Sequence, residues 1–175
     1  MTSAVRKVAS NTVANLGLRP VEPADEPFLV ELYAGTRAEE MALVPWSNEE
    51  KNTFVLHQFN AQQQHYQKVY PDANHDIILS SDRKVGQLYV ARLPTEIRII
   101  DITVAAPERN SGIGTHLLKG LMEESRRTSK PLRIYIESFN PSARLFERLG
   151  FLRTDEQGIH VLLEWSRFRS GAPGQ

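Results

Sequence analysis

The sequence predicts an α/β domain of the α+β kind, with a mixed, mainly antiparallel sheet of seven strands flanked by about four helices. Three strand-like runs in the middle of the chain are joined by turns too short for a crossover helix, which makes these strands antiparallel. A later run follows an amphipathic helix, and a strand reached through a crossover helix lies parallel to the strand before it. One parallel pair therefore stands inside an antiparallel sheet.

Length and composition limit the class of protein. A chain of 175 residues, 41% hydrophobic and 24% charged, suits one soluble globular domain with a sizeable core. Lysine plus arginine equals aspartate plus glutamate at 21 each, so charge does not favour nucleic acid or a membrane as partner. Cysteine is absent, which excludes disulfides, thiolate metal sites and a cysteine nucleophile. No apolar run approaches the ~20 residues of a membrane span, and we expect a cytoplasmic enzyme.

The ends of the chain differ from its middle. Residues 1–15 show no hydrophobic period and are expected to form a flexible arm. Residues 16–167 are expected to form the folded domain, and 168–175, rich in small residues, a disordered tail.

The leading elements are a short strand over residues 16–20 and two helices. In the first helix, apolar side chains recur at helical spacing, at Phe28, Leu29, Leu32 and Tyr33, and Pro27 restricts where the helix can start. Ser47 and Glu50 have the spacing of a capping box, which predicts the start of a second, long helix that Pro71 ends.

The central strands are expected over residues 76–79, 85–93 and 96–104. An amphipathic helix over 113–127 follows, with one apolar stripe and a charged opposite side, and then a strand over 132–136. The chain closes with three short elements. They are a helix from the Asn140-Pro141 cap to Leu149, and strands over 152–155 and 159–165.

The segment 104–115 joins a predicted strand to the N-terminus of a predicted helix. The first N–H groups of a helix have no intrahelical partner and its dipole is positive there, so such a terminus binds anions. Gly112 and Gly114 let a ligand approach the backbone, and Arg109 adds a charge-assisted contact, which favours a pyrophosphate. A P-loop would need Gly-Lys before Ser or Thr, and a dinucleotide fingerprint a third glycine at Leu117, so neither motif fits.

The run Arg109-Asn-Ser-Gly112-Ile-Gly114 resembles the acetyl-CoA loop of the GNAT N-acetyltransferase superfamily, Arg/Gln-x-x-Gly-x-Gly/Ala. The segment from Asn140 to Phe151 is similar to a second motif of that superfamily, Asn-x-x-Ala followed by Leu-Tyr-Glu-x-x-Gly-Phe. The resemblance implies a GNAT-like sheet whose parallel strand pair splays at the centre. It also implies acetyl-CoA as co-substrate, no metal, and direct transfer of the acetyl group to an amine without a covalent enzyme intermediate.

The resemblance assigns cofactor contacts residue by residue. Backbone groups of the strand, with an N–H near Ile102 that polarises the thioester, come from Ile102, Thr103 and Val104. The pyrophosphate loop consists of Arg109, Asn110, Ser111, Gly112, Ile113, Gly114 and Thr115. The second motif contributes Asn140, Ser142 and Phe146, although capping of the next helix also explains Asn140. Phe146 stands where many members have a tyrosine that protonates the departing thiolate, and Tyr135 or Ser142 are the candidates to replace it.

Asp101 is the candidate general base, because it is the only carboxylate within the apolar run of residues 99–104. The alternative for Asp101 is a structural ion pair with Arg92 or Arg133, and the second candidate base is Glu137. The five histidines show no spacing of metal ligands.

The acceptor is expected at the residues between the two leading helices, Glu39, Glu40 and Trp46, for which a solvated acidic pair is the alternative explanation. We expect an acetyl-CoA-dependent N-acyltransferase for a small-molecule or peptide amine, with no nucleic-acid or membrane partner, and leave a homodimer open. A non-catalytic CoA-binding or sensing domain and a purely structural domain are the competing interpretations.

Overall fold

The computed structural model describes residue 13 and residues 15–167 of the chain. The arm expected over 1–15 lies outside the described residues except for Val13 and Asn15, and the tail expected over 168–175 lies outside them entirely. Among the described helices, none combines the length and the hydropathy that a membrane span requires.

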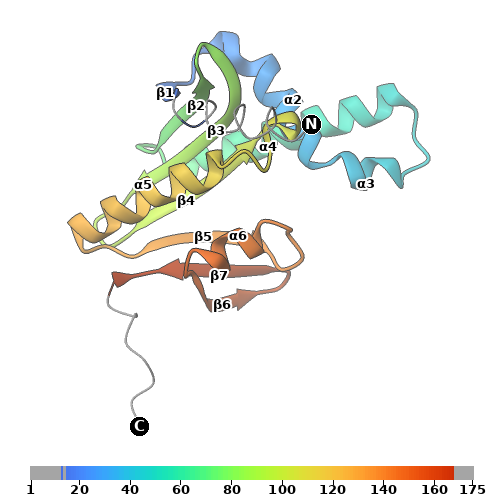
Figure 1. Ribbon diagram of the computed structural model, residues 1–175. Coiled ribbons are helices and arrows are strands. Elements are labelled where there is room, and N and C mark those ends of the chain that lie inside the picture. The colour runs from blue at the N-terminus through green and yellow to red at the C-terminus, as the bar shows by residue number, and fades with distance from the viewer. Residues whose placement is uncertain (1–12, 14, 168–175) are drawn as a thin grey trace, which may run out of the picture.

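The described residues form one mixed sheet with helices on both faces (Figure 1). In chain order the elements are β1 (Leu16–Pro20), η1 (Pro23–Asp25), α2 (Glu26–Thr36), α3 (Ala38–Ala42), α4 (Asn48–Val69), β2 (Asn74–Ser80), β3 (Arg83–Arg92), β4 (Ile97–Val104), η2 (Ala106–Glu108), α5 (Ile113–Thr128), β5 (Leu132–Glu137), α6 (Ala143–Arg148), β6 (Leu152–Gln157) and β7 (His160–Trp165). The seven strands lie in the order β1-β2-β3-β4-β5-β7-β6. Only β4 and β5 pair in parallel, so the predicted fold class is confirmed.

Two hydrophobic cores lie on opposite faces of the sheet, because neighbouring residues of a strand point to opposite sides. Ile78 packs in the larger core with Leu118 and Leu121 of α5 and Phe146 of α6. Ile77, the next residue along β2, packs in the smaller core with residues of α2 and α4. Helices α5 and α6 therefore cover one face and α2 and α4 the other.

Two helices differ from the prediction. A short helix, α3, lies between α2 and α4, where the sequence has no hydrophobic period to predict it; α3 has no buried residue. Helix α6 begins at Ala143 rather than at Pro141. The reason is local: the Asn140 side chain accepts a hydrogen bond from the Ser142 N–H at 2.9 Å, which holds the intervening residues in a turn.

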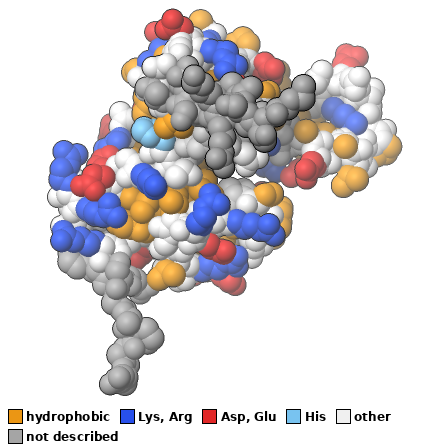
Figure 2. All heavy atoms as spheres, in the orientation of Figure 1, with side chains coloured by type: hydrophobic (Ala, Val, Ile, Leu, Met, Phe, Trp, Pro, Cys, Tyr) orange, Lys and Arg blue, Asp and Glu red, His pale blue; other side chains and the backbone are white. Residues whose placement is uncertain are grey.

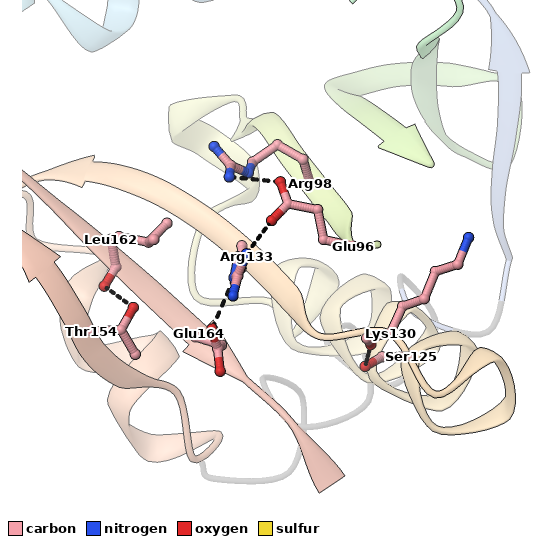
Figure 3. A network of polar contacts seen from close by, with 8 residues as sticks. All are labelled: Glu96, Arg98, Ser125, Lys130, Arg133, Thr154, Leu162 and Glu164. Carbon is pink, nitrogen blue, oxygen red and sulfur yellow. Dashed lines mark hydrogen bonds and ion pairs between the residues drawn. The ribbon is translucent and has the colours of Figure 1, made fainter. Parts of the chain in front are cut away.

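An ion-pair network fixes the end of the sheet at which β4 and β5 pair (Figure 3). Glu96, only 6% exposed, contacts Arg98 at 2.6 Å and Arg133 at 2.5 Å. Arg133 of β5 also contacts Glu164 of β7 at 2.8 Å. Since β4, β5 and β7 all contribute, the network ties the two halves of the sheet together at this end.

A second ion-pair cluster surrounds Asp25, which is 1% exposed at the corner between β1 and α2. Arg19 donates to both carboxylate oxygens, at 2.7 and 2.9 Å, and Lys84 lies 2.6 Å away. Hydrogen bonds from Arg19 and then Lys84 hold the pKa of Asp25 far below its usual range.

This cluster predicts an acid-sensitive fold. A carboxyl group whose pKa is lowered by folding contributes stability that is fully present above its unfolded pKa, about 4, and is lost as pH falls below it. We expect the free energy of unfolding in urea to fall between about pH 5 and about pH 3, on either side of the unfolded carboxyl pKa. Asp25→Asn should reduce this slope while lowering stability at neutral pH. The exposed Asp155→Asn is the control, and an unchanged slope in Asp25→Asn would contradict the assignment.

Candidate active site

Strands β4 and β5 pair only over their first residues. The parallel ladder runs from Ile97 opposite Leu132 to Ile99 opposite Ile134, and the two strands are not paired beyond it. Figure 1 shows β4 above and β5 below this separation. The backbone of β4 beyond Ile99 is therefore paired to β3 on one side alone, which is the splay that the resemblance implies.

A β-bulge at Ile100 directs the side chains of the unpaired part of β4. Ile99 pairs with Val90 and Asp101 with Tyr89, so Ile100 has no partner across β3. Under strict alternation, Asp101 would face the same core as Ile99. The extra residue turns Asp101 to the face covered by α4 instead, while Ile102 packs against the larger core.

Two donors hold the Asp101 carboxylate. Thr103 Oγ1 donates to Oδ1 at 2.6 Å, and Gln87 Nε2 donates to Oδ2 at 3.1 Å. Burial raises the pKa of Asp101, and the Thr103 hydrogen bond partly offsets this increase. Because its pKa is raised and its hydrogen-bond donors are neutral, Asp101 takes up a proton more readily than an ordinary carboxylate does, as a general base requires.

Among the described residues, Asp101 does not form the ion pair with Arg92 or Arg133 that was its alternative interpretation. Arg92 contacts Glu124 at 2.6 Å, and Arg133 contacts Glu96 and Glu164. Asp101 is bonded to neutral side chains instead.

The loop after β4 ends in a left-handed turn at the start of α5. Asn110 and Gly112 have φ angles of 60° and 89°, and Gly112 is the N-cap of α5. A glycine is favoured at Gly112 because L side chains rarely adopt that φ. Arg109 Nε donates to the Val104 carbonyl at 3.2 Å, and Ser111 donates to the Glu108 carbonyl, so the loop is held to the end of β4.

The remaining loop residues divide between core and helix terminus. Ile113 is 1% exposed in the larger core, so its contribution to an anion site would come from its backbone. A Cβ added to Gly114 would lie 3.4 Å from Leu145 Cδ2, which is an ordinary van der Waals contact, so the packing of α5 beside Leu145 does not itself require a glycine. Thr115 is half-buried in the first turn of α5.

On the β5 side, the structure places two candidate catalytic residues beyond the last pair of the parallel ladder. Tyr135 lies under the Arg98 guanidinium, 4.9 Å from ring centroid to Cζ. Glu137, at the end of β5, lies 3.7 Å from Arg37, which follows α2 and also contacts Glu40 at 2.8 Å. Arg37 therefore connects the leading helices to the end of β5.

The second motif lies at the start of α6. The expected N-cap role of Asn140 is wrong, because Ser142, which is half-buried, is the N-cap of α6. Asn140 instead accepts a hydrogen bond from the Ser142 N–H within the turn before the helix. Phe146 is 1% exposed and packs edge-on against Phe151, with ring centroids 5.2 Å apart. Its ring is part of the larger core.

The predicted acceptor residues lie on and after α3, which projects from the sheet beside the start of α4 (Figure 1). Glu39 and Glu40 are exposed, and Trp46, 40% exposed, packs edge-on against Phe54. Figure 2 shows hydrophobic side chains on this projecting part, where Leu43 is 88% exposed. No group of three or more potential metal ligands was found among the described residues.

Sequence reasoning missed the partners of Asp101. Gln87 of β3 bonds to Asp101 and His75 of β2 bonds to Gln87, and strand register brings these residues together. Tyr66 reaches the same place through the packing of α4 against Tyr89. Sequence reasoning also missed Gly86, whose added Cβ would lie 2.3 Å from the Thr103 carbonyl oxygen. An isolated glycine within a strand pattern was the available signal for that close approach.

Comparisons with known proteins agree with this architecture. The model of the Acetyltransferase (GNAT) family matches residues 37–151. No curated protein matches the sequence.

Solved structures with the same fold include three acetyltransferases. The PaiA N-acetyltransferase of Thermoplasma acidophilum, in complex with coenzyme A, is 13% identical with a TM-score of 0.64, over 86% of this chain and 98% of that one. An acetyltransferase of Thermus thermophilus is 17% identical with a TM-score of 0.63, over 89% and 99%. A GNAT family acetyltransferase of Elizabethkingia anophelis with acetyl-CoA bound is 20% identical with a TM-score of 0.56, over 87% and 98%. At these identities the likeness shows the fold, and the family match shows the membership: this chain belongs to the GNAT acetyltransferase family.

Proposed function

We propose that this protein transfers the acetyl group of acetyl-CoA to a primary amine by direct attack in a ternary complex. The observation that carries the proposal is the position of Asp101, a carboxylate of raised pKa held just where β4 leaves β5. Family membership supports acetyl transfer. The amine acceptor is our inference from the resemblance of the two sequence motifs to those of N-acetyltransferases, and the general base would serve to deprotonate it.

The loop residues fit the pyrophosphate of CoA. Gly112 brings the backbone N–H groups at the N-terminus of α5 to the surface without a Cβ, and the Arg109 guanidinium lies at the same loop. The other contacts that we propose are Asn110, Ser111, Ile113, Gly114 and Thr115, with Asn140, Ser142 and Phe146 from the second motif. Phe146 would act through the core that supports the site, because its ring is buried.

The backbone of Ile102, Thr103 and Val104 has no strand partner on the β5 side, so its polar groups on that side are left for the pantetheine arm and the thioester. An N–H near Ile102 directed at the thioester oxygen would stabilise the negative charge that develops there during attack. We propose this N–H as the oxyanion donor.

The proton inventory follows from the residues present. Asp101 takes the first proton from the acceptor ammonium, the free amine nitrogen bonds to the acetyl carbon, and the carbon–sulfur bond breaks as the thiolate leaves. The nitrogen gives up its second proton as the amide forms, which balances the proton that the thiolate takes up, and the proton held by Asp101 is released to solvent. A free thiol has a pKa of about 8.5, so the thiolate leaves readily and Phe146 in place of a tyrosine costs little. Tyr135 is the proposed proton donor to it, and Glu137 is the alternative base.

For the acceptor we propose contacts with Glu39, Glu40 and Trp46, in a small molecule or peptide that carries the amine. The exposed carboxylates support binding of a cation. The cytoplasmic location, the absence of nucleic-acid and membrane partners and the homodimer stay predictions.

The proposal is tested by turnover of acetyl-CoA with a panel of polyamines, aminoglycosides, amino acids and peptide N-termini, with matched alcohols as controls. Release of CoA that depends on an amine supports it. Binding of CoA without turnover of any acceptor would favour a CoA-sensing domain, the candidate that the buried Phe146 supports. No binding of CoA would contradict both functions.

We expect acetyl-CoA to raise the melting temperature, since a ligand at 100 times its Kd adds about 2.7 kcal/mol to stability. Arg109→Ala should weaken binding about tenfold or more by removing a charge-assisted contact, worth roughly 1.5–3 kcal/mol.

Gly112→Val should abolish binding, because valine cannot adopt φ 89° without strain. Arg127→Ala, at the other end of α5, is the control, and an equal loss in that variant would contradict a loop site.

A further inference from the structure

A buried amide lies between two polar groups of the proposed site. Gln87 of β3 is 4% exposed, and an amide so buried is costly unless both of its ends are hydrogen-bonded. Its Oε1 lies 2.8 Å from His75 Nε2, and its Nε2 donates to Asp101 Oδ2 at 3.1 Å. His75, Gln87 and Asp101 thus form a chain of hydrogen bonds across three neighbouring strands.

The hydrogen bonds between His75, Gln87 and Asp101 are favourable in only one donor-to-acceptor order. The ionised Asp101 only accepts hydrogen bonds, so the Gln87 amide must present its NH₂ to Asp101 and its oxygen to His75. His75 must then carry a proton on Nε2. Were the amide reversed, its oxygen would face a carboxylate oxygen and both would repel. The His75 ring is itself held, because it stacks on Tyr89 with centroids 4.2 Å apart and an angle of 4°.

We propose that Gln87, oriented by His75, is the positioning residue that aims the Asp101 carboxylate at the acceptor amine. Thr103 fixes one oxygen and Gln87 the other, so the plane of the carboxylate is set by two donors on the same sheet face. This inference rests on the proposed function of Asp101 and adds to it the two residues through which its orientation and ionisation are controlled.

Other titratable groups surround the chain and are part of its electrostatics. Tyr66 of α4 packs edge-on against Tyr89 at 5.6 Å, and burial followed by the charge of Asp101 raises the pKa of Tyr66. Asp76 follows His75 on β2, and burial raises the pKa of Asp76 while Arg92 opposes the increase. Tyr89 lies opposite Asp101, and burial raises the pKa of Tyr89.

The first test measures the Asp101 pKa directly, by carbon-13 NMR of its carboxyl group in the full-length protein. A donor to the carboxylate favours the ionised form, so Gln87→Ala should raise the pKa of Asp101 by about one unit. On the acid side of the pH profile, the midpoint of the rise in kcat/KM should move to higher pH by the same amount. Ser125→Ala, which removes another buried hydrogen bond far from the site, is the control and should leave both unchanged.

The second test separates orientation from packing at His75. His75→Phe keeps a ring against Tyr89 and loses the donor, so kcat should fall about tenfold with little change in the KM for acetyl-CoA. His75→Gln restores a donor and should return kcat to within about threefold of wild type. Equal losses in the two variants would overturn the orienting role of His75.

The outcomes distinguish this inference from the proposed function. If Asp101→Asn is inactive but folded Gln87→Ala keeps the wild-type Asp101 pKa and rate, the positioning role is wrong and the base assignment stands. If Asp101→Asn keeps its rate, the base assignment is wrong, whatever the NMR titration of Gln87→Ala gives. Folding of every variant is checked by circular dichroism and urea unfolding.

Discussion

Asp101→Asn is expected to lower kcat/KM by about a hundredfold or more, because a positioned general base contributes roughly 10²–10⁴-fold. The substitution keeps the size of the side chain and removes its ability to take a proton. In the wild type, kcat/KM should rise with pH as Asp101 ionises. Because burial raises the pKa of Asp101, the midpoint of this rise should lie at a higher pH than an ordinary carboxyl group would give. The residual activity of Asp101→Asn should not show this rise with pH.

Asp76→Asn is the matched control. Burial also raises the pKa of Asp76, on the neighbouring strand β2, so this carboxyl group is the other candidate for an acid limb. Asp76 takes no part in the proposed proton transfer, and His75 rather than Asp76 is the charged neighbour of Asp101. Asp76→Asn should therefore keep the acid limb of the wild-type pH profile. If Asp101→Asn stays folded and keeps both rate and profile, the base must be sought at Glu137 or in bound water.

The elements that a sequence predicts well here are those fixed by local contacts. The cap of α4 is an example: Ser47 and Glu50 exchange hydrogen bonds at 3.2 and 2.7 Å, as their spacing indicates. The start of α5 directly after Gly112 is predicted in the same way, whereas the left-handed conformation of Gly112 is seen only in the structure. Sequence rules of this kind apply over about one helical turn, and the loop between β4 and α5 is short enough for them to apply.

The surroundings of Asp101 could not be predicted in this way, because they depend on the bulge at Ile100. A single extra residue reverses which face a side chain points to, and alternation would have placed Asp101 against α5. Its partners Gln87 and His75 then follow from the register of β3 with β4 and of β2 with β3. A single sequence does not specify strand register, so the carboxylate could be identified while its hydrogen-bond partners could not.

Gly86→Ala is expected to have the largest effect on the fold. Gly86 lies opposite Val104 in the β3–β4 ladder, and an added Cβ would lie 2.3 Å from the Thr103 carbonyl oxygen and 3.2 Å from Val104 Cα. Both are backbone atoms of a paired strand, so relief requires β4 itself to move. We expect a loss of about 3 kcal/mol, the upper range for overpacking, and a melting temperature lower by about 6–12 °C.

The displacement should also remove acetyl transfer, since Thr103 and Val104 belong to the backbone that we propose to hold the thioester. Gly120→Ala is the control: Gly120 lies in α5 with nothing within 4 Å of its added Cβ, and alanine there should raise stability by up to about 1 kcal/mol. Calorimetry and acetyl-CoA titration of the two variants measure both effects. A Gly86→Ala protein with wild-type stability and acetyl-CoA affinity would contradict the close approach of β3 to β4. A Gly86→Ala protein that is destabilised but binds acetyl-CoA and transfers the acetyl group normally would show that the end of β4 can shift without harm to the thioester site. The oxyanion donor would then have to be sought away from Ile102.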